Sequence, residues 1–246
     1  MVLAAGRGAR MRPLTDHTPK PLLRVQGQPL LDWHLAALQR DGVQQVVVNT
    51  AWLGAQIPAH LDARWAGSAL ALHYSHEAQN GAPALETAGG IARALPQLGA
   101  AFWLAAGDVY APDFVFDAAM AQAFAASSDL AHVWLVPNPS HHPQGDFGWQ
   151  PDGPGSTCGR ALNGPAADGT RWTYSTIALL KAALFAAPWS DLQPGNPQGV
   201  VAPLAPLLRA AMDAGRCGAS CYTGRWTDVG TPERLAQLNA DAPELK

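Results

Sequence analysis

The first half of the chain alternates short apolar runs with longer segments in which apolar residues recur at helical spacing. The short runs have the length and composition of buried strands. They lie at Val2–Ala4, Gln45–Asn49, Ala69–Ser75, Ala101–Ala105 and Ala131–Val136. The pattern of Leu30–Arg40 predicts a helix that ends near Gly42. This alternation predicts an α/β fold, a Rossmann-like, mostly parallel mixed sheet with helices on both faces.

The second half has a different pattern. Residues 137–169 are rich in proline, glycine and polar residues, and they contain only short extended pieces such as Asp146–Gln150. We expect residues 137–180 to form a small β insertion within a single domain that spans residues 1–246. Beyond 169, the predicted strands are Trp172–Leu180 and Gly218–Thr223, and the predicted helices are Val201–Ala214 and Thr231–Ala240.

Length and composition limit the class of protein. A chain of 246 residues with 48% hydrophobic residues can bury a large core. A formal net charge of −3 argues against binding to nucleic acid, which needs clustered lysine and arginine. The first predicted strand begins almost at Met1. This fits a given sequence that lacks a few residues which would complete the strand.

Location is predicted from what the sequence lacks and from its cysteines. It has neither an apolar run of about 18 residues nor a signal-peptide pattern, so we expect no membrane association. Three cysteines without zinc-ligand spacing fit a reducing compartment. We therefore expect a cytoplasmic protein, and its oligomeric state stays open.

The stretch 3–23, LAAGRGARMRPLTDHTPKPLL, carries the strongest chemical signal. Gly6 and Gly8 would let the backbone approach phosphate oxygens and present its N–H groups. Arg10 can direct two donors at a phosphate, and Lys20, held between two prolines, can place a compact charge where negative charge develops. The spacing predicts a triphosphate-binding loop. The alternative is a plain strand-to-loop turn with solvated cations.

This stretch, extended to LLDW at 30–33, resembles the N-terminal signature of the nucleoside-diphosphate-sugar pyrophosphorylases, or sugar-1-phosphate nucleotidylyltransferases. The likeness continues in LETAGGI at 85–91, GD at 107–108 and WTDVGTPERL at 226–235. It implies the nucleotide-diphospho-sugar transferase fold, with the β insertion facing the sugar over the active site. Arg10 and Lys20 would be catalytic, and the nucleotide would be bound by Ala4, Ala5, Gly6, Gly8, Gly89 and Gly107.

A pair of aspartates suggests a metal. Asp108 follows the apolar run AFWLAA, and Gly107 gives the backbone room there. Mg²⁺ prefers oxygen ligands and often takes only one or two protein carboxylates. The resemblance implies that Asp108 and Asp228 hold Mg²⁺, although Asp108 alone also fits a turn or helix-cap aspartate.

The resemblance also implies the reaction. A sugar 1-phosphate would attack the α-phosphorus of a nucleoside triphosphate, and pyrophosphate would leave without a covalent enzyme intermediate. The expected sugar contacts are Glu86, Thr87, Asp146, Gly148 and Thr176. PALETAGGI and NPSHHPQGDF resemble the branch that joins UTP to N-acetylmuramate 1-phosphate in cell-wall recycling. Enzymes that join GTP to mannose 1-phosphate are the alternative.

Four departures from the family pattern affect the expected sugar and active-site contacts. Many relatives have glycine where Glu86 and Thr176 stand, and asparagine where Ala106 stands. Residues 150–170 contain no lysine to bind the sugar phosphate, which leaves Arg160 or Arg171 as candidates.

Two other classes of function fit less well. A dinucleotide-binding oxidoreductase needs GxGxxG leading directly into a helix, whereas the prolines after Met11 prevent one. A catalytically silent regulator that binds nucleotide sugars is the second, and the four charged residues Arg10, Lys20, Asp108 and Asp228 argue against it.

Overall fold

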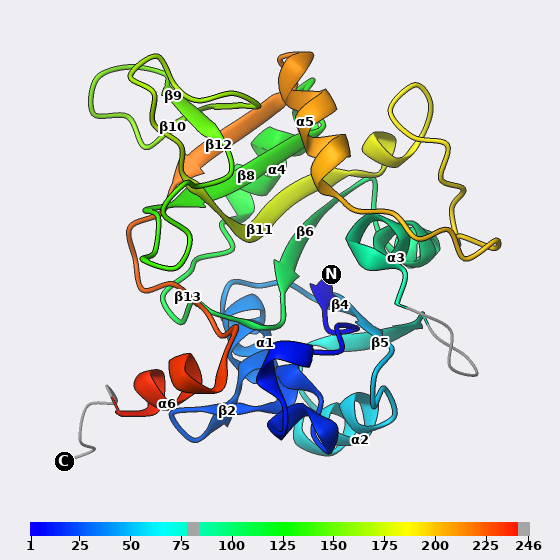
Figure 1. The fold of residues 1–246 in the computed structure, drawn as a ribbon. Coiled ribbons are helices and arrows are strands. Elements are labelled where there is room, and N and C mark those ends of the chain that lie inside the picture. Colours follow the sequence, from blue (N-terminus) through cyan, green and yellow to red (C-terminus); the bar gives the residue numbers. More distant parts are fainter. Residues whose placement is uncertain (78–83, 241–246) are drawn as a thin grey trace. The chain divides into compact units, whose positions relative to one another are not determined.

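A computed structural model describes residues 1–77 and 84–240, which form two compact units. Unit 1 comprises Met1–Leu85, Ala106–Val115 and Arg225–Lys246, and unit 2 comprises Glu86–Ala105 and Phe116–Gly224. Figure 1 shows the course of the chain through both. The expectation of a single domain over 1–246 stays a prediction.

Unit 1 is built around three parallel strands in the order β5-β4-β1. These are β1 (Val2–Leu3), β4 (Gln45–Thr50) and β5 (Ala71–His76). The remaining elements are the short strands β2 (Arg24–Val25), β3 (Gln28–Pro29), β7 (Val109–Tyr110) and β13 (Thr227–Asp228), the helices α1 (Leu30–Arg40), α2 (Gln56–Arg64) and α6 (Pro232–Ala240), and the 3-10 turns η1 (Ala9–Met11), η2 (Leu14–Asp16) and η3 (Lys20–Leu22). Helix α1 has the predicted bounds, because its apolar face packs in the core.

One apolar cluster joins parts of unit 1 that are distant in sequence. Met11 of the glycine loop packs with Leu30 of α1, Tyr110 of β7, Val229 after β13 and Leu235 of α6. Each of these side chains is buried. Burial of apolar area contributes about 25 cal/mol per Å². The loop and the chain around residue 228 are therefore held by the same core.

Unit 2 contains the strands in the order β6-β11-β8-β12-β10-β9. They are β6 (Ala101–Ala106, whose last residue belongs to unit 1), β8 (Ala131–Val136), β9 (Gly148–Pro151), β10 (Cys158–Leu162), β11 (Thr173–Lys181) and β12 (Cys217–Cys221). Strands β8 and β12 are parallel, and β11 and β10 run against their neighbours. The predicted α/β fold with a mixed sheet in which most strands share one direction is confirmed.

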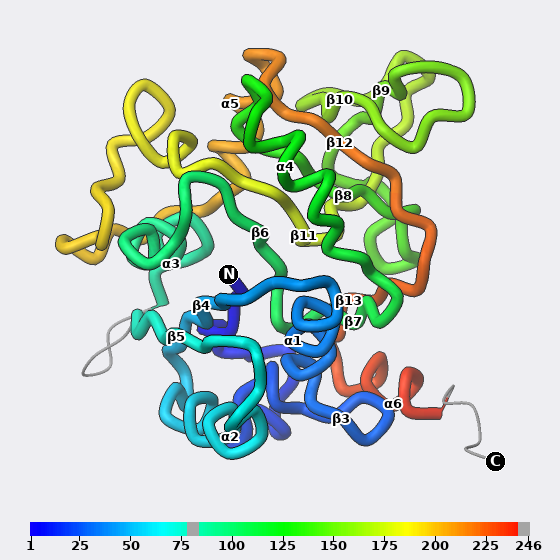
Figure 2. The backbone as a smooth tube through the Cα atoms, turned by 180° about the vertical axis from the view of Figure 1, so that it is seen from behind, coloured from blue at the N-terminus to red at the C-terminus, as the bar shows by residue number. Residues whose placement is uncertain are grey.

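Helices cover both faces of the unit 2 sheet. They are α3 (Glu86–Ala94), α4 (Ala118–Ala126) and α5 (Ala205–Asp213), with the 3-10 turns η4 (Leu95–Gln97) and η5 (Ala182–Phe185). Figures 1 and 2 show α5 and α4 on opposite faces. Helix α5 begins four residues later than its predicted start at Val201, because Pro203 disfavours helical backbone at the residue before it. Among the described helices, none is long and apolar enough to cross a membrane.

The predicted insertion at 137–180 consists of two structural parts. Strands β9 and β10 form an antiparallel pair beside β12, whereas β11 lies between β6 and β8. The first part therefore extends the sheet and the second is a central strand. The expected role of residues 137–180 in binding a sugar stays a prediction.

Candidate functional site

The glycine loop of unit 1 is tightly folded at Gly8. Gly8 has a φ of 62°, and a Cβ there would lie 3.0 Å from Thr15 and 3.1 Å from Lys20. The Thr15 hydroxyl donates to the Gly8 carbonyl at 2.8 Å. At Gly6, by contrast, a Cβ would meet nothing within 4 Å. Gly8 is therefore required by the packing of the loop, and Gly6 leaves open space beside the backbone.

Two of the three arginines in the loop are engaged in holding it. The Arg7 guanidinium lies 3.6 Å from the Trp52 ring centroid and donates to the Thr15 carbonyl and the Asp16 carboxylate. Arg12 also donates to Asp16, at 2.8 Å. Both arginines lower the pKa of Asp16, with the Arg7 hydrogen bond the largest cause.

Arg10 differs from both neighbouring arginines. Among the described residues it makes no hydrogen bond or ion pair, and it is exposed. It lies on η1 directly after Gly8, the tight point of the loop. The guanidinium is therefore available for an anion. Arg10 was the only one of the three that the sequence predicted to bind phosphate, and the partners of Arg7 and Arg12 are set by the folded loop.

Lys20 and Asp108 meet within unit 1 although 88 residues separate them. The Lys20 Nζ donates to the Asp108 Oδ2 at 2.6 Å. The Lys20 side chain is 10% exposed and that of Asp108 is 43% exposed, so the ammonium is buried beneath a carboxylate that solvent reaches. Gly107 donates its N–H to the Leu3 carbonyl, and a Cβ there would lie 2.7 Å from that oxygen. This close approach explains the glycine before Asp108.

Asp228 is brought to Asp108 by the pairing of two short strands. Asp228 of β13 lies opposite Val109 of β7, and the Val229 N–H donates to the Asp108 carbonyl at 3.0 Å. His34 supports β7 from α1 through a 2.8 Å hydrogen bond to the Val109 carbonyl. Burial lowers the pKa of His34, so it is neutral and its Nε2–H donates. Both aspartates thus occupy neighbouring register positions.

Arg234 is a partner of Asp228 that sequence reasoning missed. Its Nη1 donates to the Asp228 Oδ2 at 2.5 Å from the first turns of α6. A Cβ at Gly230 would lie 2.7 Å from this nitrogen, so the glycine makes room for the pair. Arg234 stands within the motif WTDVGTPERL, and a charged residue six positions after Asp228 is the signal that could have found it.

The donor set fits Mg²⁺. Asp108 and Asp228 offer carboxylate oxygens from neighbouring stretches of backbone, and Mg²⁺ often takes only one or two protein carboxylates, with phosphates and water supplying the rest. Each carboxylate also has a cation beside it, which would compensate for charge before a metal binds. No group of three or more candidate ligand side chains occurs in the described ranges.

In unit 2, two expected sugar contacts have a backbone conformation that is uncommon for residues with side chains. Glu86, the first residue of α3, has a φ of 56°, and Thr176 in β11 has a φ of 63°. Left-handed backbone is strained for L-residues, above all β-branched ones, and glycine adopts it freely. This explains why glycine suits both positions in the family pattern. Strain of this kind concentrates at functional sites.

Other expected contacts of unit 2 are used within the fold. Asp146 accepts hydrogen bonds from the Tyr174 N–H at 2.8 Å and has His142 at 3.1 Å. Gly148 is required by packing, because a Cβ would lie 2.5 Å from the Gly164 carbonyl. Thr87 is half-buried on the first turn of α3.

Gly89 also has internal partners. Its N–H donates to the Ala202 carbonyl at 3.1 Å, and its own carbonyl accepts from the Asn196 side chain at 3.1 Å. Ala88 donates to the same Ala202 carbonyl. Gly89 is one of the predicted nucleotide contacts, and its backbone N–H and carbonyl already have hydrogen-bond partners within unit 2.

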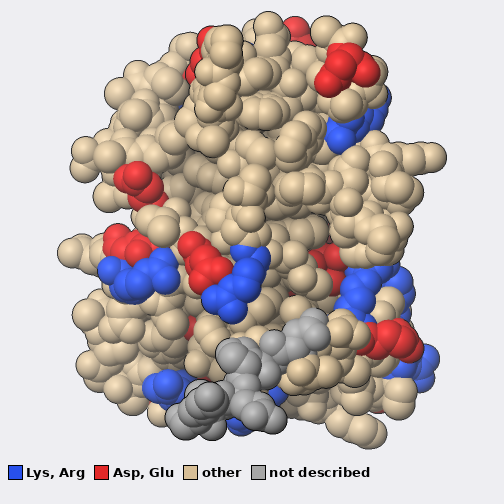
Figure 3. Space-filling view, turned by 90° about the vertical axis from the view of Figure 1, so that its left-hand side faces the viewer, with Lys and Arg blue, Asp and Glu red and all other residues tan. Residues whose placement is uncertain are grey.

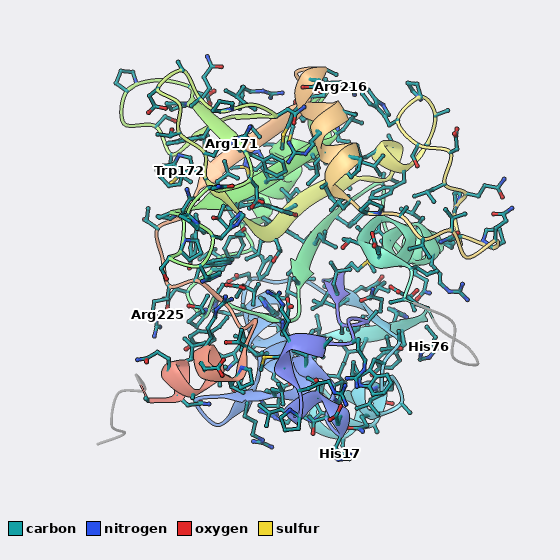
Figure 4. All side chains as sticks on the ribbon, viewed as in Figure 1. His17, His76, Arg171, Trp172, Arg216 and Arg225 are labelled. Carbon is teal, nitrogen blue, oxygen red and sulfur yellow. The ribbon has the colours of Figure 1, made fainter. Side chains whose placement is uncertain are left out.

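The two arginines considered for the sugar phosphate are likewise engaged. Arg160 donates to both oxygens of Asp129 and to the Gly215 carbonyl. Arg171, which Figure 4 labels beside Trp172, donates to the Asp146 carbonyl at 2.8 Å. Both fasten loops of unit 2.

Several arginines and aspartates of the described residues form ion pairs. On the face shown in Figure 3, basic and acidic side chains lie close to one another. Arg225 and Asp113, for example, form a 2.6 Å ion pair in unit 1. An arginine held in such a pair is less available to an anion than Arg10, which is exposed and makes no ion pair among the described residues.

Comparison with known proteins decides the family. Residues 1–219 match the MobA-like NTP transferase domain. The chain belongs to this family. It is 45% identical over 250 residues to the N-acetylmuramate alpha-1-phosphate uridylyltransferase of Neisseria meningitidis serogroup B, covering 100% of this chain and 99% of that protein. The predicted likeness to sugar-nucleotide-forming transferases is confirmed.

Two further relatives are more distant. A mannose-1-phosphate guanylyltransferase of Mycobacterium tuberculosis is 35% identical over 99 residues, covering 40% of this chain and 26% of that protein. A solved Bacillus anthracis structure, titled as a glucose-1-phosphate thymidylyltransferase with sucrose, has a TM-score of 0.74 at 19% identity and covers 100% of this chain and 95% of its own. The second likeness shows the fold.

Proposed function

We propose that this transferase makes a nucleotide sugar by joining the uridylyl group of UTP to N-acetylmuramate 1-phosphate, with release of pyrophosphate. The full-length similarity to an N-acetylmuramate alpha-1-phosphate uridylyltransferase carries the choice of substrates. The arrangement of Arg10, Lys20, Asp108 and Asp228 in unit 1 supports the chemistry.

The reaction needs positioning and charge stabilisation more than proton transfer. A phosphate oxygen of the sugar 1-phosphate forms a bond to the α-phosphorus, and the bond to the pyrophosphate oxygen breaks in line with it. The incoming phosphate is already anionic at neutral pH, so no general base is required. The protein must hold the triphosphate and compensate for the charge that develops on its oxygens.

The residues of unit 1 divide this work. The backbone of Ala4, Ala5, Gly6 and Gly8 is proposed to lie against the triphosphate, with Gly107 allowing its close approach. Arg10 would bind the β- and γ-phosphate oxygens that leave, and Lys20 would lie against the reacting phosphate. Asp108 and Asp228 would hold Mg²⁺, which when bound would draw charge from the phosphate oxygens.

The proposed sugar contacts belong to unit 2. We assign Glu86, Thr87, Asp146 and Thr176 to the sugar, since the strain at Glu86 and Thr176 is of the kind that persists where function requires it. Gly148 is also assigned to the sugar, and Gly89 to the nucleotide, as the family resemblance implies.

The test is a pyrophosphate-release assay with each of the common triphosphates against a panel of sugar 1-phosphates, with and without Mg²⁺. We expect turnover with UTP and N-acetylmuramate 1-phosphate, loss of turnover when the metal is chelated, and little turnover in folded Lys20→Ala or Asp108→Ala. Preference for GTP and mannose 1-phosphate would replace the proposed substrates. Full activity in either folded variant would contradict the mechanism, and no turnover with any pair would favour the silent binder.

A further inference from the structure

A buried hydrogen-bond chain crosses unit 1 beside the glycine loop. The Ala4 N–H donates to the Asn49 Oδ1 at 2.6 Å, and the Asn49 Nδ2 donates to the Glu77 Oε1 at 2.5 Å. The Leu85 N–H donates to the Glu77 Oε2 at 3.0 Å. All four residues are buried. We name this chain the Asn49–Glu77 relay.

The relay lies at the carboxyl ends of three neighbouring parallel strands. Ala4 follows β1, Asn49 lies in β4 opposite Leu3, and Glu77 follows β5. This edge of an open α/β sheet is where ligands bind. One end of the relay holds the first residue of the glycine loop. The other holds Leu85, which directly precedes Glu86.

We propose that Glu77 is a positioning residue for the nucleotide. Acting through Asn49, its carboxylate sets the position of the backbone from Ala4 to Gly8, and it fixes the chain at Leu85 at the same time. This inference rests on the proposed function, because it assigns the glycine loop to a nucleoside triphosphate. Glu77 itself need not touch the nucleotide.

The direction of the hydrogen bonds requires a carboxylate at position 77. Backbone N–H groups stand at both ends, and a backbone N–H only donates. Asn49 must therefore turn its carbonyl oxygen to Ala4 and its NH₂ group to Glu77. Glu77 then accepts one hydrogen bond on each of its two carboxylate oxygens, whereas an amide has a single accepting oxygen and would turn its NH₂ group toward one of the two donors. In a buried network an unsatisfied donor is costly, so the relay tolerates little rearrangement.

This polarity gives a compensating pair of variants. Glu77→Gln places an NH₂ group against either the Asn49 NH₂ or the Leu85 N–H. Asn49→Asp places two carboxylates against each other. Together, however, the two substitutions restore the three hydrogen bonds of the relay: the new carboxylate at 49 accepts from Ala4 and from the amide at 77, whose oxygen accepts from Leu85. The double variant also keeps the formal net charge.

A control lies directly beside the relay, where Thr50 follows Asn49 and His76 precedes Glu77. The Thr50 hydroxyl and the His76 Nδ1 share a 2.7 Å hydrogen bond between β4 and β5, and Figure 4 labels His76 there. Thr50→Val removes this bond with little change of shape. This hydrogen bond does not include Ala4. The substitution should therefore lower stability and leave nucleotide affinity unchanged.

The experiment measures the affinity for UTP with Mg²⁺ by calorimetry and the temperature of unfolding, for the unmodified protein and these variants. We expect each single relay variant to bind UTP about tenfold more weakly, a loss comparable to that of one buried hydrogen bond. The double variant should return to within about threefold of the unmodified protein, as coupled residues do. Thr50→Val should bind UTP normally.

Several results would overturn the proposal. Normal UTP affinity in Glu77→Gln, an equal loss in Thr50→Val, or a double variant no better than the single ones would each show that the relay is merely structural. If Glu77→Gln does not fold, Glu77→Asp replaces it, because it keeps both accepting oxygens but withdraws them by one methylene. Normal UTP affinity in Glu77→Asp would contradict the positioning role of Glu77. If the unmodified protein binds no triphosphate, the proposed function itself is wrong, and the positioning role falls with it.

Discussion

Arg7, Arg10 and Arg12 show how three identical residues acquire different roles within one loop. Arg7 and Arg12 converge on Asp16, and Arg7 also stacks on Trp52. Arg10 has none of these partners and is exposed. Ion pairs at exposed positions contribute about 0–1 kcal/mol, so their loss is tolerated. An arginine that binds a phosphate contributes far more to the reaction.

Replacing Arg10 should therefore damage catalysis without damaging the fold. We expect Arg10→Ala to lower kcat/KM by about 100-fold, which corresponds to about 2.7 kcal/mol of transition-state stabilisation. Its unfolding temperature should stay unchanged, because Arg10 makes no contact of this kind within the described chain. Steady-state kinetics of pyrophosphate release and a thermal melt provide the two measurements.

Arg12→Ala is the matched control. It removes an exposed arginine two positions after Arg10. Its partner, Asp16, still forms an ion pair with Arg7. We expect kcat/KM to stay within about threefold of the unmodified protein, in line with the small worth of an exposed pair. Equal losses in the two variants would mean that the loop needs only its total positive charge.

At the scale of elements, β11 contains the clearest conflict between residue and backbone. Thr176 has a φ of 63° within the strand, where the register against β8 shifts between Tyr174 and Ala178. A left-handed conformation costs an L-residue roughly 1–2 kcal/mol, and glycine avoids most of this cost. The irregularity re-aims one side chain without ending the strand, as bulges commonly do.

Thr176→Gly should not destabilise the protein. We expect the free energy of unfolding to stay the same or rise by up to about 1 kcal/mol, since relief of strain offsets the loss of a side chain. Activity with the sugar 1-phosphate should fall if Thr176 contacts the sugar as proposed. Chemical denaturation and the KM for the sugar phosphate measure the two effects.

Thr173→Gly is the control, because it makes the same substitution at a position whose φ is not left-handed. Thr173 is buried in the same strand and its hydroxyl donates to the Asn138 side chain at 2.9 Å. Glycine there loses a hydrogen bond and packing, so we expect a loss of about 1–2 kcal/mol or more. A similar loss in Thr176→Gly would show that strain at position 176 is not significant.

At the scale of the whole molecule, burial of titratable groups links stability to pH. Burial is the largest cause that lowers the pKa of His132 to about 4, and its Nε2 bonds to the Ser220 hydroxyl at 2.8 Å. In the unfolded chain a histidine titrates near 6.5. Between these values the unfolded state binds the proton and the folded state does not. Stability from His132 is therefore present above pH 6.5 and lost as pH falls toward 4.

We predict that the unmodified protein loses about 2 kcal/mol between pH 7 and pH 5 because of His132 alone. His132→Gln keeps a polar group toward Ser220 and removes the titration. Its free energy of unfolding should start lower at pH 7 and fall less steeply. Denaturant titrations at several pH values measure both slopes, and parallel slopes would rule out His132 as the cause.

Part of the candidate site could be predicted from the sequence. The glycine loop, Lys20 between its prolines and Asp108 after an apolar strand are local patterns, and local patterns are visible along the chain. Arg234 and the Asn49–Glu77 relay were not predicted. Their roles depend on partners that the fold brings together, and a buried asparagine or glutamate resembles any other polar residue in a sequence.

The sequence by itself determined where most of the longer strands and α1 lie and which residues could bind phosphate, because hydrophobic spacing, glycine and proline act over a few residues. Only the tertiary structure decided which of these groups work together. It pairs Lys20 with Asp108, sets Asp228 beside them through β7 and β13, and leaves Arg10 alone among three arginines exposed and unpaired within the described residues. Distances between residues far apart in the chain arise from packing of the whole core, which no local pattern contains.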